Sequence, residues 1–583
     1  MKRDDRDFTI RPGKVGDGGA RSGSRAKSLA AQVRRAAAKA GHARRSARPG
    51  TGGTGHLGRG RSAALNARFN RTNRRVVIKA RVVRHHGARY RAAPLARHVA
   101  YLERDGVTRD GRDANLFDRT SEVADGDAFA ERCDGDRHHF RFIVSPEDAS
   151  QMTDLRAFTR ELMHDMARDL GTDLDWVAVD HWNTDNPHIH VLVRGRATDG
   201  SDLVIDRDYI REGMRARAEA RATLELGPRS EREIEAALGR EVGAQRFTNL
   251  DRQLVRTADE NGGIVDLRPG VPGPETYRRI LLLGRAAELQ RLGLADPVAP
   301  ATWTLRSDLE PTLRDLSIRT DIIKTMHRAM AGSDRAADPS SFALQGDAAA
   351  DPIIGRLVER GLHDELSGSA YAVIDGADGR VHYVRFADLE TTGDAAPGAI
   401  VEVRHWNGPH GDTRLSLAVR SDLSLEQQIE ARGTTWLDRQ LVSQSPTPTA
   451  GGFGRYIRDA LEKREARLVE EGLARRVGSG VSIQRGLIET LKARELEDAV
   501  LRKVGQTGLA HSPSAPGDYV SGIYRERVTL SSGRFAMIDD GLGFQLVPWR
   551  PALDAHLGQH ITGTMGPGGA VDWSLGRTRG LGR

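Results

Sequence analysis

The chain has 583 residues, with 88 Lys and Arg against 80 Asp and Glu, and its length predicts about three to five domains rather than one core. No apolar run is long enough to span a bilayer, and the segment MKRDDRDFTIRPGK lacks the apolar stretch of a secretory signal, so we expect no insertion into a membrane. The single cysteine, Cys133, excludes an intrachain disulfide and fits a reducing compartment.

Positive charge is concentrated in residues 1–75. This segment holds 20 Lys and Arg against 4 Asp, a net charge of +16, so the remaining residues carry −8 within the total of +8. It is rich in Gly, Ala and Ser and nearly free of large apolar side chains, which predicts a disordered basic arm. Such an arm can neutralise DNA phosphates without reading sequence, and the alternative is that it only aids solubility.

Residues 76–250 alternate short strands and helices, which predicts one α+β domain with an antiparallel hairpin near its centre. The strand runs are rich in β-branched residues, and the longest helix has apolar residues at three- and four-residue spacing, with Gly171 placed to end it. The expected elements, in chain order, are a strand at 76–83, a helix at 94–106, a strand at 140–145, the helix with Leu155, Phe158, Leu162, Met166 and Leu170 on one face, and strands at 176–181 and 188–195.

The C-terminal half contains an internal repeat. Residues 289–313 and 468–491 share the plan helix, Gly-Leu-Ala, short hairpin, helix, which is typical of a winged helix, and residues 379–403 and 541–564 share a β-rich plan. Winged helices bind DNA or mediate protein contacts, and both roles stay open. The expected units are winged-helix-like at 251–345, a small β-barrel at 346–425, a second winged-helix-like unit at 426–510, and a second small β-barrel with a basic tail at 511–583.

A histidine-rich stretch, DHWNTDNPHIHVLVRG at 180–195, holds the densest chemistry in the chain. His188 and His190 are two residues apart on a predicted strand, so their side chains leave the same face. His181 ends the preceding strand and can face them across the turn. Three converging imidazoles predict a metal site with open coordination positions, as a catalytic metal requires. The competing interpretation is that these are surface or core histidines beside a turn.

Two carboxylates lie beside these histidines. A metal-bound histidine usually donates its second N–H to a carboxylate or a carbonyl group, which fixes its tautomer, and Asp180 or Asp185 could accept it. We predict that Asp185 is a catalytic residue, although its Asn-Thr-Asp-Asn-Pro context is also typical of an ordinary turn.

A metal that activates a phosphodiester still needs an attacking group, and two tyrosines are candidates. Tyr101 lies on a short polar helix in RHVAYLERDG, and Tyr90 lies upstream in GARYRAA. A phenol has an ordinary pKa near 10, so a metal, a base or nearby positive charge must favour its ionised form. Either ring could instead pack into a core, and the residues alone do not distinguish the two.

These motifs, in this order, resemble the relaxases, or mobilization nucleases, of the HUH endonuclease superfamily. The branch that includes the T-DNA border endonuclease is most similar. Its nucleophile motif, Tyr-Leu-x-Arg-x-Gly, resembles YLERDG at 101–106, and its metal motif resembles HWNTDNPHIH at 181–190. The resemblance covers about residues 76–250, and the C-terminal half resembles an extension found on one subgroup.

The resemblance implies a mechanism. One strand at a transfer origin binds as single-stranded DNA, a divalent metal held by His181, His188 and His190 polarises the scissile phosphate, and Tyr101 attacks and keeps the 5′ phosphate. The family implies Mg²⁺ or Mn²⁺, whereas imidazole ligands alone would also suit Zn²⁺. It further implies relaxosome accessory proteins and type IV coupling or secretion proteins as partners, and a location in the bacterial cytoplasm, from which the protein can pass with the DNA into a recipient.

Three further residues are candidates for contacting the DNA. Relatives carry a serine near the scissile phosphate, which points to Ser145, but Ser-Pro-Glu-Asp is also a helix-start signature, and we favour Ser145 as a helix cap. Arg194 and Arg196 follow the histidine strand and could contact phosphate, or they could simply end a strand with charge.

One departure from the family concerns the proton acceptor. Relatives often have Asp two residues after the first histidine, where this chain has Asn183. An amide cannot accept a proton as a carboxylate does, so the acceptor for Tyr101 stays open between Asp185, His98 and bulk water.

Two rival functions are also compatible with the sequence. A zinc-type metallohydrolase would use a metal-bound hydroxide and form no covalent adduct. A non-catalytic DNA-binding protein would rely on the winged-helix-like units and be indifferent to chelators. The tail SLGRTRGLGR at 574–583 resembles the Arg-rich export signals of some secreted relaxases. Its deletion should then abolish transfer and leave nicking intact, and transfer by the truncated chain would contradict this hypothesis.

Overall fold

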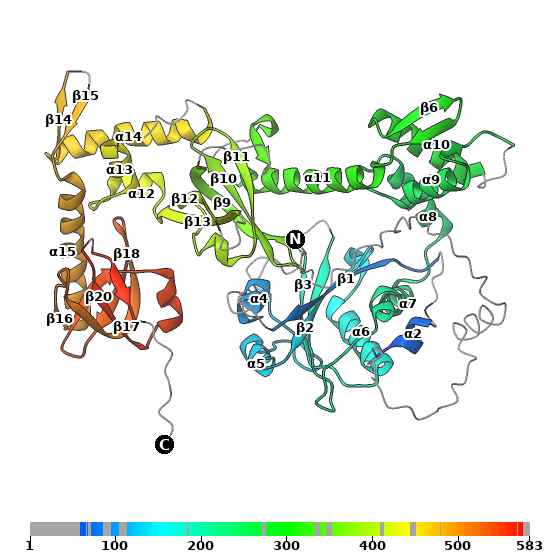
Figure 1. The fold of residues 1–583 in the computed structure, drawn as a ribbon, viewed down its shortest axis with the longest axis horizontal. Helices are drawn as coiled ribbons and strands as arrows, with labels where there is room; N and C mark the ends of the chain where they lie inside the picture. Colours follow the sequence, from blue (N-terminus) through cyan, green and yellow to red (C-terminus); the bar gives the residue numbers. More distant parts are fainter. Residues whose placement is uncertain are drawn as a thin grey trace, which may run out of the picture. The chain divides into compact units, whose positions relative to one another are not determined.

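The fold is a mixture of helices and mainly antiparallel sheets (Figure 1). The computed structural model describes residues 59–65, 67, 72–85, 95–103, 114–182, 186–270, 276–332, 338–344, 352–407, 413–443, 451–478, 480–567 and 569–574. The chain divides into two compact units, Met1–Ala237 and Leu238–Arg583. The first unit therefore ends ahead of the boundary that the sequence predicts at residue 250.

The first unit is built on a four-stranded antiparallel sheet with the strand order β1-β2-β4-β3. Its strands are β1 (Val76–Arg84), β2 (His138–Pro146), β3 (Trp176–His181) and β4 (His188–Arg194). The four predicted strands are confirmed, and β3 and β4 form the expected hairpin. The helices are α2 (Arg61–Leu65), α4 (Leu95–Leu102), α5 (Gly126–Arg132), α6 (Leu155–Leu170) and α7 (Met214–Leu226), with a 3-10 turn η1 (Ala149–Gln151) and a π-helical turn η2 (Tyr209–Gly213). Helix α8 (Glu231–Val242) contains the boundary between the two units.

Helix α6 forms where its sequence predicts it. The Asp154 side chain accepts hydrogen bonds from the backbone N–H groups of Arg156 and Ala157 and so begins the helix. Gly171 ends it in the left-handed conformation, with φ of 64°, which glycine adopts without strain. The whole apolar stripe is buried: Leu155, Phe158, Leu162, Met166 and Leu170. The predicted helix and its predicted end are confirmed.

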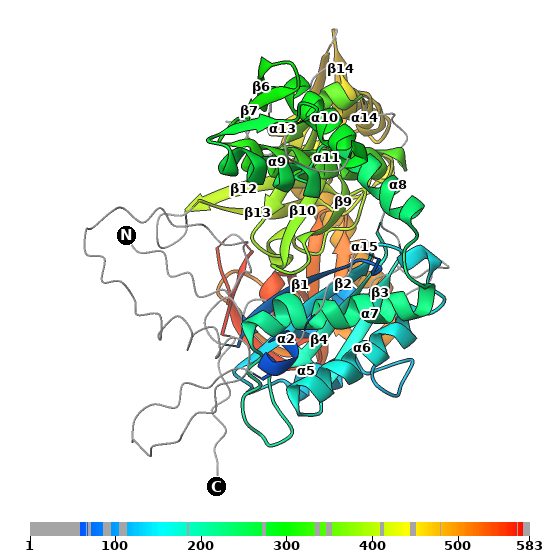
Figure 2. The same ribbon diagram turned by 90° about the vertical axis from the view of Figure 1, so that its right-hand side faces the viewer.

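The two faces of the sheet carry different residues because side chains alternate along each strand. Ile189 and Val193 of β4 point into a core formed with α6 and α7, and Figures 1 and 2 show these two helices side by side along the sheet. His188, His190 and Leu192 leave the opposite face, where Leu192 packs in a second core with α4 and α5. The two histidines therefore lie on the face that carries α4.

The predicted helix cap at Ser145 is wrong. Ser145 lies within β2, whose pairing with β1 extends to Pro146, and Asp154 is the residue that caps α6. The signature Ser-Pro-Glu-Asp describes only its own few residues, whereas the backbone partners of Ser145 come from the distant strand β1. Helix α4 is also shorter than expected, since it ends at Leu102 and is followed by a turn at Glu103.

Part of the basic arm is folded, which corrects the expectation of disorder for those residues. Arg59 forms a β-bridge with Ile205, and its backbone N–H donates to the Val204 carbonyl oxygen at 2.7 Å. Helix α2 follows at once, and Ala64 is buried in the main core of the first unit. Residues 1–58 of the arm lie outside the described residues.

The predicted internal repeat is confirmed in the second unit. After α8, the first copy consists of α9 (Asn249–Glu260), α10 (Thr276–Arg291), β6 (Ala295–Ala299), β7 (Thr302–Leu305), α11 (Leu309–Ala331), β8 (Phe342–Leu344), β9 (Ile354–Asp364), β10 (Ser369–Gly376), β11 (Val381–Phe386), the turn η4 (Glu390–Thr392), β12 (Ile400–Asn407) and β13 (Thr413–Ser421). It also has β5 (Ile264–Asp266), which extends the β6–β7 hairpin to three strands, and the turn η3 (Pro339–Ser341).

The second copy has corresponding elements in the same order. After α12 (Leu425–Glu430), it consists of α13 (Trp436–Ser443), α14 (Gly452–Glu470), β14 (Ala474–Val477), β15 (Gly480–Ile483), α15 (Leu487–Thr507), β16 (Ala510–His511), β17 (Tyr519–Leu530), β18 (Gly533–Asp539), β19 (Gly543–Pro548), the turn η5 (Pro551–His556), β20 (His560–Met565) and β21 (Val571–Trp573). The predicted plan of helix, hairpin and helix is thus present in both copies. None of the described helices is both long enough and apolar enough to cross a membrane.

A buried arginine–aspartate pair joins the helices in both copies. Arg285 of α10 donates to both carboxylate oxygens of Asp251 at 2.7 and 3.0 Å, and Arg464 of α14 donates to both oxygens of Asp438 at 2.8 and 2.9 Å. Each arginine also donates to three backbone carbonyl groups, those of Val242, Ala244 and Arg246 in the first copy and those of Ile429, Ala431 and Gly433 in the second. Each guanidinium group therefore connects its helix to the two segments that precede it.

The β-rich part of each copy is an open six-stranded sheet and not the small barrel that the sequence predicts. The strand order is β13-β12-β9-β10-β11-β8 in the first copy and β21-β20-β17-β18-β19-β16 in the second. In each sheet one edge strand is parallel to its neighbour, β8 to β11 and β16 to β19. Among the described residues, the two edge strands of a sheet do not pair with each other, so neither sheet closes.

Candidate metal centre

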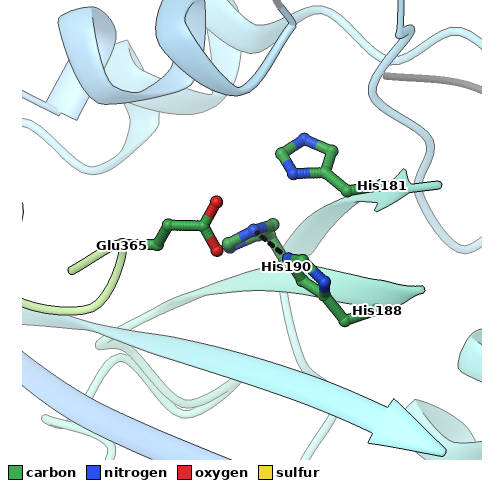
Figure 3. Close-up of side chains that lie close together, drawn as sticks. All are labelled: His181, His188, His190 and Glu365. Carbon is green, nitrogen blue, oxygen red and sulfur yellow. Dashed lines mark hydrogen bonds between the residues drawn. The ribbon is translucent and has the colours of Figure 1, made fainter. Parts of the chain in front are cut away.

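Three histidines of the β3–β4 hairpin point toward one another (Figure 3). The strand register pairs His181 directly with His188 and places His190 opposite Val179, so all three side chains leave the same face of the sheet. All three are buried, with exposed fractions of 0% for His181, 9% for His188 and 3% for His190. The structure thus brings together the three histidines that the sequence singles out.

The nitrogen atoms of these rings are spaced as ligands of one ion would be. One nitrogen from each ring lies within 4.8 Å of the others, and the Nε2 atoms of His188 and His190 are 3.1 Å apart. Two nitrogens bound at about 2.1 Å to a common ion lie roughly 3.0–3.4 Å apart, depending on the angle at the metal. The three residues therefore belong to a group that could hold a metal ion.

Backbone carbonyl groups fix which nitrogen of two rings carries the proton. His188 Nδ1 lies 3.0 Å from the carbonyl oxygen of Asn186, and His181 Nε2 lies 3.1 Å from that of Leu102. Because a carbonyl oxygen only accepts, each neutral ring must carry its proton on the nitrogen that donates there. This leaves Nε2 of His188 and Nδ1 of His181 as the nitrogens with lone pairs for a cation.

Asp180 is not the group that orients these histidines. It points to the opposite face of β3, where its two oxygens accept hydrogen bonds from Arg156 Nε at 3.0 Å and from Trp182 Nε1 at 2.7 Å. The backbone oxygens of Leu102 and Asn186 orient the rings instead. Every residue has a backbone carbonyl group, so a sequence cannot show which one accepts from a histidine. Carboxylate side chains can be recognised in a sequence, and they are therefore the candidates.

Tyr101 lies near the C-terminal end of α4 and is half-buried. Its neighbour Leu102 provides the carbonyl oxygen that accepts from His181, so the helix that carries the tyrosine is hydrogen-bonded to a histidine of the cluster. This contact places a phenol-bearing helix and three imidazoles in one part of the first unit. Three residues of the sequence prediction lie outside the described residues: Tyr90, Asn183 and Asp185.

The two arginines that follow the histidine strand are bound by a buried carboxylate. Arg194 Nε and Arg196 Nε donate to the two oxygens of Asp136 at 2.7 and 3.0 Å, and the Asp136 side chain is 2% exposed. This ion pair gives both arginines a structural role. Ser145 is closer to the cluster, because its hydroxyl donates across 3.5 Å to the carbonyl oxygen of Pro187, just before the histidine strand.

Sequence reasoning missed a row of cationic side chains on the same face as the histidines. In the register, Lys79 of β1 stands opposite Ile143 of β2, which in turn stands opposite His190 of β4. Arg81 and Arg141 are paired with each other and lie two residues along the same face. Lys79 is exposed and Arg81 is half-buried, so these two side chains can meet a polyanion that approaches the histidines, whereas Arg141 is buried and donates to His139. The sequence signal for it is the alternation of Lys79 and Arg81 within an otherwise apolar strand.

A second pair of histidines, His85 and His139, lies on the β1–β2 side of the sheet. Arg141 Nε donates to His139 Nε2 at 3.0 Å, so a neutral His139 carries its proton on Nδ1 and donates it to His85 Nε2, 2.5 Å away. Burial and the neighbouring Arg141 lower the pKa of His139 well below its ordinary value of 6.5. Burial also lowers the pKa of His85. Both rings are therefore neutral at pH 7.

Comparison with known protein families identifies the second unit. The model of a family described as "Protein of unknown function (DUF3363)" matches residues 282–415 and 409–582. These segments contain most of the two repeat copies and together cover just over half of the 583 residues. No curated protein and no solved structure matches the chain. The chain belongs to the family described as "Protein of unknown function (DUF3363)".

Proposed function

We propose that the chain is a relaxase, a nuclease that nicks one DNA strand at a transfer origin through Tyr101 and stays joined to the cut 5′ end. The observation that carries the proposal is the hydrogen bond between His181 and the Leu102 carbonyl group. It connects a three-histidine cluster suited to a divalent cation with the helix that carries the candidate nucleophile. A covalent nick needs both parts, whereas a hydrolytic metal site needs only the first.

The nick exchanges one phosphoester for another. His181, His188 and His190 would hold the cation through their ring nitrogens, and the ion, Mg²⁺ or Mn²⁺ with Zn²⁺ as the alternative, would polarise the scissile phosphate as a Lewis acid. The Tyr101 oxygen forms the new bond to phosphorus, and the bond from phosphorus to the 3′ oxygen breaks. The leaving oxygen takes up a proton and becomes a free 3′ hydroxyl. Bond energy is nearly conserved, so the same site can reseal the strand.

The phenol of Tyr101 must lose its proton for this attack, because its ordinary pKa is near 10. Among the acceptors that the sequence suggests, His98 is the one that the structure describes. It lies three residues before Tyr101 on α4, hence on the same side of the helix, and it is half-buried. This position supports His98 as the acceptor, with Asp185 and bulk water as the alternatives.

Single-stranded DNA fits the face of the sheet that carries the histidines. The exposed Lys79 and the half-buried Arg81 offer positive charge to the phosphates of a bound strand. The basic arm that precedes β1 adds further charge to the same unit. Both features support a polyanionic substrate over a neutral one.

The test uses the full chain with labelled single-stranded oligonucleotides that tile the intergenic DNA of its own element, in Mn²⁺ or EDTA. We expect an adduct that survives SDS, requires Mn²⁺, disappears in Tyr101→Phe and persists in Tyr90→Phe. An adduct lost only in Tyr90→Phe would support the relaxase function and identify Tyr90, rather than Tyr101, as the nucleophile. Cleavage without an adduct would contradict the proposal and favour a hydrolase. Neither product, on a set known to include the origin, would favour a non-catalytic DNA-binding protein.

A further inference from the structure

The two repeat copies contain matching hairpins whose positions can be compared one for one. The β14–β15 hairpin follows α14, as Figure 1 shows, and the β6–β7 hairpin follows α10. In the register, Ala474 pairs with Ile483 and Ala295 pairs with Leu305. The backbone N–H groups just before the hairpins also make the same contact, Leu473 to Leu468 at 2.9 Å and Leu294 to Leu289 at 2.8 Å. A difference between the two hairpins is therefore a difference in side chains on one scaffold.

The two hairpins differ in charge, since residues 473–486 carry +3 and residues 294–307 are neutral. Residues 473–486 contain Arg475, Arg476 and Arg485 and no acidic residue. In the first copy, Asp296 and Pro297 occupy the places of Arg475 and Arg476. The first hairpin does have one arginine, Arg306, but it is bound to the Asp308 carboxylate at 2.7 Å.

The three arginines of the second hairpin are available to a partner. Arg475, Arg476 and Arg485 are all exposed, and none forms an ion pair within the described part of the chain. Arg485 also precedes Gly486, the N-cap residue of α15, where a positive charge opposes the dipole of the helix. Folding therefore does not explain its charge, whereas a bound anion would.

We propose that the β14–β15 hairpin is a second DNA-binding site, which binds the phosphate backbone of double-stranded DNA through Arg475, Arg476 and Arg485. Arginine is the residue type that matches phosphate with several hydrogen bonds, and a two-stranded ribbon fits a duplex groove. Single-strand sites depend on aromatic side chains that stack on bases, and residues 473–486 contain none. The choice of DNA as the polyanion rests on the proposed function, but the binding needs neither the histidines nor Tyr101.

With this site, the two units would bind different forms of DNA. The first unit acts on a single strand, while this hairpin holds duplex DNA of any sequence, because contacts to phosphate carry no sequence information. The first copy, with Asp296 in the matching hairpin, lacks this ability and serves as an internal control.

The first experiment is hydrogen exchange of the full chain with and without a short duplex of arbitrary sequence, in EDTA. We expect the duplex to slow exchange in residues 473–486 and to leave residues 294–307 unchanged. Equal effects on both hairpins, or none on residues 473–486, would overturn the proposal. Protection of residues 473–486 by a single strand but not by a duplex would also overturn it.

The second experiment measures duplex affinity between roughly 50 and 200 mM salt for the triple variant Arg475→Ala, Arg476→Ala, Arg485→Ala. We expect affinity to fall by about 10-fold or more at low salt, and the slope of log affinity against log salt to decrease by about 2 to 3, since each phosphate contact contributes about 0.9. The matched control is Arg306→Ala. An unchanged slope in the triple variant would contradict the proposal.

Nicking separates this inference from the proposed function. The triple variant should nick a single-stranded oligonucleotide as well as the unaltered chain does. A chain that binds duplex DNA through the hairpin but forms no adduct would leave this inference standing and contradict the relaxase.

Discussion

The position of the proton on each imidazole ring of the histidine cluster determines which ring nitrogens can bind a cation. The Nε2 atoms of His188 and His190 face each other at 3.1 Å, and the proton of His188 is held on Nδ1 by the Asn186 carbonyl oxygen. The nitrogen that faces His190 therefore carries a lone pair, and such an arrangement is stabilised by a proton or a cation between the rings. Either His190 Nε2 donates its own proton to this lone pair, or one cation binds both nitrogens.

We expect His190→Ala to lower the affinity of the chain for Mn²⁺ by about 100-fold or more, since it removes one of three predicted ligands. Isothermal titration calorimetry with the full chain measures this directly. The matched control is His164→Ala, which removes an exposed histidine of α6 in the same unit. Equal Mn²⁺ affinity in the two variants would exclude the cluster as the metal site.

The thiol of Cys133 should be inert in the folded protein. Cys133 is fully buried, and this burial raises its pKa to about 12. A protonated, shielded thiol does not react as a nucleophile at neutral pH. We expect no reaction with a disulfide reagent under native conditions and one reactive thiol per chain in denaturant. Rapid native labelling at neutral pH would show that the core around α5 is open.

The buried histidines His85 and His139 should make the first unit sensitive to acid. Burial lowers the pKa of both rings, so they stay neutral in the fold while the unfolded chain takes up protons near the ordinary value of 6.5. The unfolded state then binds more protons, and stability falls as pH drops below about 6.5, by up to ~1.4 kcal/mol per pH unit for the fully buried His139 and by less for the half-buried His85.

Hydrogen exchange of the β2 amides tests this dependence. After correction for intrinsic exchange rates, protection should be weaker at about pH 5.5 than at about pH 7. The variant His139→Gln, whose side chain does not titrate, should reduce the difference. Protection that is independent of pH in the unaltered chain would contradict the assignment of neutral buried rings.

Individual elements could be predicted where local forces determine them. Helix α6 carries its own cap, its apolar stripe and its terminating glycine, so its sequence predicts both ends. The β3–β4 hairpin was predictable for the same reason, because its two strands flank a short turn-forming segment. Ser145 shows the limit, since a local cap signature competes with β1–β2 pairing that no local pattern contains.

The buried arginine of each repeat should stabilise its helices strongly. Arg464→Met removes five hydrogen bonds and leaves the Asp438 carboxylate buried without its partner, which costs about 3–5 kcal/mol. Urea titration followed by hydrogen exchange in α13 and α14 measures the loss. Arg467→Met is the control, because Arg467 lies on the same helix and is partly exposed. Equal urea resistance in both variants would contradict this role.

For the whole molecule, the sequence predicts the repeat correctly but not that each β-sheet stays open instead of closing into a barrel. Repetition is visible because matching segments keep Gly-Leu-Ala and its spacing, and the buried arginines follow the same pattern: Arg285 and Arg464 precede Gly293 and Gly472 by the same number of residues. A charged residue inside a helix nevertheless suggests exposure, so their burial was missed. Whether a sheet closes depends on pairing between distant edge strands, and single strands do not encode it.

The candidate site was predictable to a similar extent. The spacing of His188 and His190 and the turn before them place three imidazoles on one face, and the structure has them there. The backbone oxygens that orient these rings come from residues without a chemical signature, Leu102 and Asn186. Motifs therefore reveal ligands and nucleophiles, whereas the contacts that hold them depend on the fold.

The most direct test of the relaxase is to identify the amino acid joined to DNA. The SDS-stable adduct is purified, digested with nuclease and trypsin, and analysed by mass spectrometry. The relaxase mechanism predicts that residues 98–104, the tryptic peptide HVAYLER, carry 5′-phosphorylated nucleotides on Tyr101. Nucleotides attached to any other residue, or an unmodified peptide in a cleaved reaction, would contradict a nick made by Tyr101.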